Sequence, residues 1–159
     1  MPVKNQKRRT NSDDAGGPVG AALTVFLADS YVLLAKTQAC HWNATGPDFF
    51  ALHKLTEAQY GEVFAAIDTL AERLRALSIR APGGLGELLS LATLEDGTVA
   101  MTTQQAAQIL ADANSAMARH ADDVAAQADE AEDAGTHDLL VARSIAHDKA
   151  AWLLRSHLN

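Results

Sequence analysis

The chain has 159 residues, of which 48% are hydrophobic and 21% are charged, and its formal net charge at pH 7 is −7. This length predicts a single domain with a core of its own, and the composition is ordinary for a globular protein. The single cysteine, Cys40, excludes an intrachain disulfide framework and fits a reducing cytoplasm.

Four of the thirteen basic residues lie within the first twelve positions, where no acidic residue occurs: Lys4, Lys7, Arg8 and Arg9. The remaining nine basic residues stand against all 20 acidic ones, so a short basic arm precedes an acidic body. The residues between the charges of the arm are mostly polar and cannot bury enough apolar surface to become ordered. We therefore expect a flexible basic tail over residues 1–16 and a folded domain over residues 17–159.

An arginine pair ahead of the apolar run 19–28 could indicate an export signal. Two acidic residues and a Gly-Gly pair separate these features, however, and Asp29 interrupts the run. The run is also too short to cross a membrane. We therefore expect a cytoplasmic protein with no membrane partner.

Prolines occur at positions 2, 18, 47 and 82 alone, which leaves long helical segments between them. The first helix is predicted over residues 18–43. The second begins at a turn signal, with Pro47 in its first turn, and continues to about Ser78. Pro82 and the adjacent glycines end this helix, and the apolar piece 85–91 predicts a small helix inside a long crossover.

Two further helices follow the crossover. Thr102 and Gln105 have the spacing of a capping box, which predicts a third helix over residues 103–134. Gly135 would end that helix, and Thr136 would cap the fourth. Four helices with one long crossover between the second and the third, itself carrying a short helix, are typical of an all-α, ferritin-like four-helix bundle.

The second helix carries two half-sites for a metal ion. His53 and Glu57 are four residues apart, as are Asp68 and Glu72, so each pair presents its side chains from one face. The eleven residues from Glu57 to Asp68 correspond to a rise of about 16 Å, which no single ion can span. A second, antiparallel copy of this helix would bring each pair against the other and form two identical sites. His41 would join from the first helix.

Imidazole and carboxylate ligands suit iron, manganese or zinc, and the lack of a cysteine cluster argues against structural zinc. No glutamate is followed by histidine three positions later, so the usual intrachain di-iron motif is absent. Gly61 lies beside the point where the two helices would cross, and close backbone approach there would explain a glycine inside a helix. Spacing alone leaves a solvated helix face as an equal alternative.

A longer motif resembles a known family. The run from His41 to His53, HWNATGPDFFALH, followed by Tyr60 and the segment 68–73, DTLAER, closely resembles the Dps family (DNA-binding protein from starved cells), the mini-ferritins. The resemblance extends to the ending 148–155, so it covers essentially everything after the tail. It implies a shell of twelve subunits that binds Fe(II) at dimer interfaces, oxidises it preferably with hydrogen peroxide, and stores the ferric mineral.

By position, the resemblance implies a ferroxidase site with two irons whose ligands are His41 and His53 of one subunit and Asp68 and Glu72 of its partner. Glu57 departs from the family, which usually has aspartate there, so its role as a ligand of the second iron stays open. Trp42, beside His41, would be a redox-active aromatic or simply a large residue that fills the interface.

The acidic stretch around the predicted end of the third helix corresponds to the threefold pores of the family. The pore candidates are Asp138, Asp133 and Glu130, although an ordinary acidic helix end is an equal alternative. Twelve basic tails on one shell would bind double-stranded DNA without sequence specificity, through avidity, and would make the protein nucleoid-associated. The alternative function is that of an architectural nucleoid-associated protein with little ferroxidase activity.

Overall fold

The computed structural model describes residues 16–97 and 102–158, and the regular structure in these two ranges is helical. Within these ranges five helices follow one another: α1 (Gly17–Asn43), α2 (Phe49–Ala76), α3 (Leu85–Leu91), α4 (Thr103–Glu130) and α5 (Ala134–Arg155). The predicted all-α bundle with a short helix in its crossover is confirmed. The basic tail, with Lys4, Lys7, Arg8 and Arg9, lies outside the described residues.

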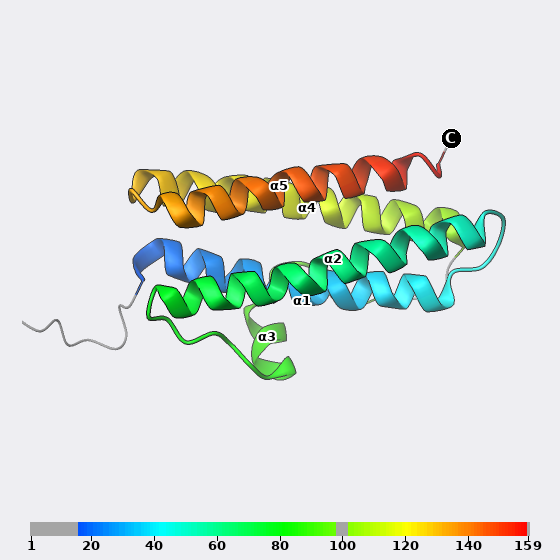
Figure 1. Cartoon of the computed structure of the whole chain (residues 1–159). Helices are drawn as coiled ribbons and strands as arrows, with labels where there is room; N and C mark the ends of the chain where they lie inside the picture. The colour runs from blue at the N-terminus through cyan, green and yellow to red at the C-terminus, as the bar shows by residue number, and fades with distance from the viewer. Residues whose placement is uncertain (1–15, 98–101, 159) are drawn as a thin grey trace, which may run out of the picture.

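The bundle consists of two helical hairpins, α1 with α2 and α4 with α5 (Figure 1). The crossover that carries α3 leads from the end of α2 back along the bundle to the start of α4. There the backbone N–H of Thr103 donates to the carbonyl of Thr45 (3.0 Å), and the Thr103 hydroxyl donates to the carbonyl of Pro47 (2.7 Å). The α1–α2 turn is therefore fixed against the N-terminus of α4.

Helix α1 is long and unusually apolar, and its place in the core of the bundle accounts for this. By length and composition α1 could cross a membrane, which the shorter run 19–28 did not suggest. A long helix in the core of a bundle passes the same test, and Leu23, Phe26 and Leu27 of α1 are buried against apolar side chains of α2, α4 and α5. More than half of the most apolar stretch of α1 is thus buried inside its own bundle.

Two predicted helix ends were wrong. Helix α4 ends at Glu130 rather than at residue 134, and α5 is capped by Asp133, whose carboxylate accepts the N–H of Thr136 (3.1 Å). Gly135 lies inside α5, where a Cβ atom would stand 3.1 Å from the guanidinium of Arg73. Arg73 pairs with Asp133, so this glycine leaves room for an ion pair instead of ending a helix.

The start of α2 also differs from the prediction. The helix begins at Phe49 after Asp48 in a left-handed conformation (φ 59°), so Pro47 lies before the first turn and not within it. The predicted capping box at the start of α4 is confirmed in both halves: the Thr102 hydroxyl accepts the Gln105 N–H, and the Gln105 side chain accepts the Thr102 N–H.

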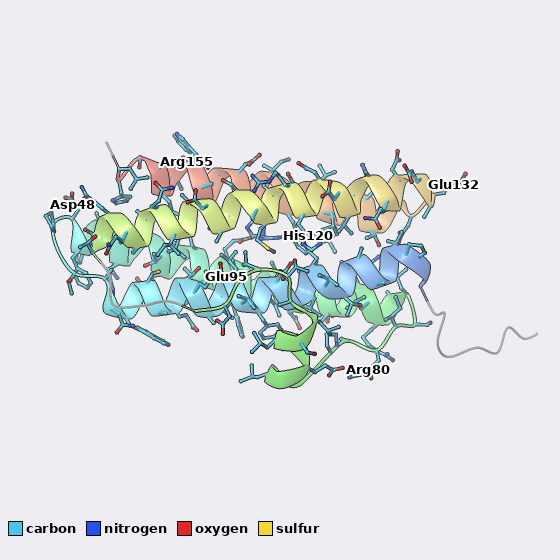
Figure 2. The ribbon with its side chains drawn as sticks, turned by 180° about the vertical axis from the view of Figure 1, so that it is seen from behind. Asp48, Arg80, Glu95, His120, Glu132 and Arg155 are labelled. Atoms are coloured by element: carbon cyan, nitrogen blue, oxygen red, sulfur yellow. The ribbon has the colours of Figure 1, made fainter. Side chains whose placement is uncertain are left out.

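Two buried charges on α1 hold the crossover in place. The Asp29 carboxylate accepts the backbone N–H groups of Thr93 (2.6 Å) and Leu94 (2.7 Å), while the Lys36 ammonium donates to the carbonyls of Glu95 (2.7 Å) and Gly97 (3.1 Å). Figure 2 shows this part of the crossover, with Glu95 labelled, running along α1 toward the start of α4. Asp29 and Lys36 therefore satisfy crossover backbone groups that no helix or sheet pairs.

Asp29 also contacts α4. Its carboxylate lies 3.1 Å from Nδ1 of His120. Burial by itself raises the pKa of Asp29, but hydrogen bonds from His120, Leu94 and Thr93 outweigh burial and leave the pKa below its usual value. The carboxylate is thus held in its ionised form at the junction of α1, α4 and the crossover.

Candidate metal centre

Two histidines meet where the α1–α2 turn reverses the chain. His41 lies in the last turn of α1 and His53 in the second turn of α2. Their rings stack with centroids 3.7 Å apart and planes 14° from parallel. His41 is buried and His53 is half-buried, so the pair stands at the edge of the subunit.

The two histidines hold each other through their backbones. Nδ1 of His41 lies 2.9 Å from the carbonyl oxygen of His53, and Nδ1 of His53 lies 3.0 Å from the carbonyl oxygen of His41. Since a carbonyl oxygen can only accept, each Nδ1 carries the proton and donates. In the neutral ring this leaves the lone pair on Nε2, which is the tautomer that binds a metal ion.

Aromatic rings surround this pair. Tyr60 meets the His41 ring edge-on, and Phe49 lies tilted against His53, each with centroids 5.2 Å away. Trp42 and Phe64, however, are both 67% exposed. Trp42, next to His41, and Phe64, farther along α2, are thus two large apolar side chains open to a partner.

The three carboxylates of α2 that were predicted as metal ligands, Glu57, Asp68 and Glu72, are exposed. Glu57 pairs with Lys54 (2.7 Å), and the hydrogen bond and the charge of Lys54 hold the pKa of Glu57 below its usual value. Among the described residues, no three histidine, cysteine or acidic side chains converge into a metal-binding group. The structure therefore brings His41 and His53 together, and it does not bring Asp68 or Glu72 to them within one subunit.

A row of hydrogen-bonded polar side chains, which was not predicted from the sequence, crosses the interior of the bundle. Arg143 pairs with Glu62 and also contacts Nε2 of His147 (3.1 Å), whose Nδ1 lies 2.9 Å from the side-chain oxygen of Asn114. Burial, assisted by the charge of Arg143, lowers the pKa of His147 to about 3, so this histidine is neutral. The i, i+4 spacing of Arg143 and His147 among apolar residues was the available signal.

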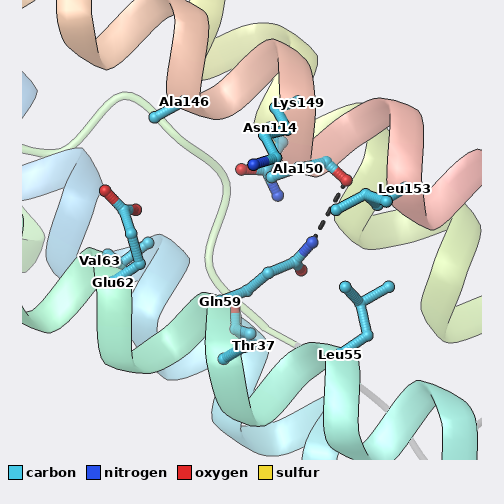
Figure 3. A pocket seen from close by; sticks show the side chains of 11 residues that line it. Thr37, Leu55, Gln59, Glu62, Val63, Asn114, Ala146, Lys149, Ala150 and Leu153 are labelled. Atoms are coloured by element: carbon cyan, nitrogen blue, oxygen red, sulfur yellow. Dashed lines mark hydrogen bonds between the residues drawn. The ribbon is translucent and has the colours of Figure 1, made fainter.

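A groove of about 330 Å³ lies between α2 and α5 beside this row of polar side chains. Within it Nε2 of Gln59 donates to the carbonyl of Ala150 (3.3 Å; Figure 3). The groove lining contains Glu62 and Asn114 but no histidine, so it has no imidazole and carboxylate set for a metal ion. The candidate metal centre is the His41–His53 pair.

Known proteins match this chain over nearly its whole length. The family model described as a ferritin-like domain matches residues 20–159. A low temperature-induced protein of Nostoc sp. is 39% identical over 134 residues, which are 83% of this chain and 75% of that protein. A DNA protection during starvation protein of Brevibacillus brevis is 35% identical over 148 residues, which are 88% of this chain and 94% of that protein. The chain belongs to the Dps family.

A solved Dps structure agrees. Dps from Vibrio cholerae O1, described as a member of a broad superfamily of ferritin-like diiron-carboxylate proteins, superposes with a TM-score of 0.87 at 28% identity. The superposition covers 98% of this chain and 100% of that one. The ferritin-like fold is thereby confirmed. Membership of the Dps family supports iron storage and DNA protection as general functions and iron as the metal.

The pore candidates differ in their surroundings. The Asp133 carboxylate is engaged by Arg73 and Thr136 and is 18% exposed, so it serves the α4–α5 turn. The Asp138 side chain is 84% exposed and lies 3.2 Å from Nδ1 of His137, and Glu130 is exposed as well. Asp138 and Glu130 are therefore the two candidates whose carboxylates a hydrated cation can approach.

Proposed function

We propose that this Dps-family chain is a ferroxidase that oxidises Fe(II), its substrate, with hydrogen peroxide at sites between subunits. Twelve subunits form a shell that stores the ferric mineral. The observation that carries this proposal is the reciprocal hydrogen bonding of His41 and His53, which leaves both Nε2 lone pairs for a metal ion. Spare imidazole lone pairs beside a carboxylate-bearing helix are a donor set that Fe(II) accepts.

The remaining ligands in this proposal are Asp68 and Glu72 of the partner subunit. Both are exposed on α2, on the helix face that continues from His53 and Glu57. A Cβ atom added at Gly61, between the two pairs, meets nothing within one subunit. Close approach of a partner helix would explain this glycine, which lies beside the point where the two antiparallel helices would cross.

Each site would take two iron ions. One hydrogen peroxide accepts two electrons, one from each Fe(II), so that its O–O bond breaks to two hydroxides without release of a hydroxyl radical. Glu57 would bind the second iron in place of Lys54, which pairs with its carboxylate in the single subunit. Asp138 and Glu130 would attract Fe(II) to the shell.

Oxidation assays on the assembled protein test this function. We expect two Fe(II) to be consumed per hydrogen peroxide, faster than under air, by a particle of twelve subunits of 16.8 kDa, about 200 kDa in all. Size-exclusion chromatography with light scattering gives the mass, and stopped-flow absorbance gives the rates. A particle of this mass that consumes no Fe(II) under either oxidant would favour the architectural alternative.

We further propose that the protein acts in the cytoplasm, away from membranes, and associates with the nucleoid by binding double-stranded DNA through its tail. Deletion of residues 1–12 is expected to weaken binding at least about tenfold in a gel shift at low salt, because twelve sets of four cations are lost. Binding by the intact protein should also fall steeply as salt rises.

The matched control keeps the tail and its charges but replaces neutral residues. Asn5, Gln6 and Asn11 changed to alanine should bind DNA as the unmodified protein does, since phosphate contacts come from the cations. Undiminished binding after the deletion would place the DNA contact elsewhere on the shell.

A further inference from the structure

Thr56 contacts the histidine pair from inside the subunit. It is completely buried on α2, and its hydroxyl oxygen lies 3.1 Å from Nδ1 of His41. The same oxygen lies 2.8 Å from the carbonyl of Leu52 and 3.1 Å from the carbonyl of His53. Three polar groups therefore surround one hydroxyl.

The directions of these hydrogen bonds follow from the donors present. The carbonyl of His53 requires the proton on Nδ1 of His41, so Nδ1 is a donor. A hydroxyl has a single proton, and the shorter contact assigns it to the carbonyl of Leu52. The lone pair of Thr56 then accepts from His41, whose N–H is shared between Thr56 and the carbonyl of His53.

This arrangement distinguishes Thr56 from other hydroxyl residues in the helices. Thr24, Ser30 and Thr37 also donate to the carbonyl four residues earlier, each at 2.8 Å. That bond alone satisfies a buried hydroxyl in a helix. For Thr56 the same bond in addition turns the lone pair toward a histidine ring.

We propose that Thr56 is a positioning residue for His41, an inference that rests on the iron site proposed above. Its buried hydroxyl is a second acceptor for the Nδ1–H of His41, beside the carbonyl of His53, and would hold the ring in the orientation that leaves Nε2 for the iron. Within the described residues, Nδ1 of His53 has one acceptor, the carbonyl of His41, and His53 is less buried. The Thr56 hydroxyl thus gives His41 on α1 an additional hydrogen bond that His53 on α2 lacks.

Cobalt(II), bound to the assembled protein and followed by its visible absorbance, is the probe. Thr56→Val keeps the shape and removes the acceptor, so affinity for the first ion should fall about ten- to hundredfold, the usual cost of losing such a support. Thr56→Ser should stay within about threefold of the unmodified protein. In Fe(II) oxidation, Thr56→Val should raise the half-saturating Fe(II) concentration while leaving the saturated rate nearly unchanged.

Thr37→Val is the matched control, because it removes an equally buried hydroxyl with the same helix bond and no histidine contact. If Thr37→Val and Thr56→Val lose the same amount of cobalt affinity, the proposed role of Thr56 is wrong. It is also wrong if Thr56→Val loses no affinity while His41→Ala does; the proposed iron site stands in both cases. Unchanged cobalt binding in His41→Ala would instead remove the proposed iron site itself. Should Thr56→Val fail to assemble, Thr56→Cys carries the same test with a weak acceptor, and wild-type affinity there overturns the proposal.

Discussion

Subunits with His41→Ala and subunits with Asp68→Ala should each lose Fe(II) oxidation by at least about 100-fold, yet regain about one quarter of it when they assemble together. In a mixed dimer, one site lacks both residues and the other site has both. Random mixing makes half of the dimers mixed, so about a quarter of all sites are complete. Co-expression of differently tagged subunits, followed by the peroxide assay, measures this recovery.

A second mixture provides the negative control. His41 and His53 belong to the same half-site, so subunits with His41→Ala and subunits with His53→Ala cannot complete one another in any dimer. We expect no recovery there, although both variants should form the shell. Absence of recovery in the first mixture, with both parents assembled, would rule out a site shared between subunits.

Asp29→Ala should lower the free energy of unfolding by about 3 kcal/mol, because two backbone N–H groups of the crossover lose their buried acceptor. Urea unfolding at fixed protein concentration measures the change. Asp122→Ala, an exposed aspartate of α4, is the control and should cost less than about 0.5 kcal/mol. Equal effects of the two substitutions would show that Asp29 does not hold the crossover.

The same carboxylate contributes to the pH dependence of stability. The pKa of Asp29 is lower in the folded protein than in the unfolded chain, so the unfolded chain binds more protons. The contribution is complete above the ordinary aspartate pKa of about 4 and is lost as pH falls through the lower folded value. Asp29→Asn, which cannot ionise, should therefore flatten the acid limb of a stability curve below about pH 4.

Local signals in the sequence predicted the helices well, but they misplaced three helix ends: the start of α2, the end of α4 and the start of α5. The capping box of Thr102 and Gln105 is complete within four residues, so the sequence contains everything that forms it. Gly135 is also a local signal, but here the glycine accommodates the guanidinium of Arg73, which lies far away in the sequence. Pro47 was likewise misplaced, because its turn is fixed by Thr103 of α4.

The candidate metal centre, too, could be predicted only in part from the sequence. Helical spacing identified the two half-sites on α2, since periodicity alone determines a helix face. The contact of His41 with His53 depends on the path of the turn between α1 and α2, which no periodicity encodes. Asp29 looked like an interruption of an apolar run, and its role became visible only with the crossover beside it.

The histidine pair is anchored to main-chain oxygens, and these remain when a side chain is replaced. A substitution at His41 leaves the carbonyl that holds His53, and the reverse is also true. Point changes therefore affect one ligand at a time. A residue inserted or deleted in the turn 44–48 would instead shift both carbonyls at once, so the length of this turn is under tighter constraint than the identity of its residues.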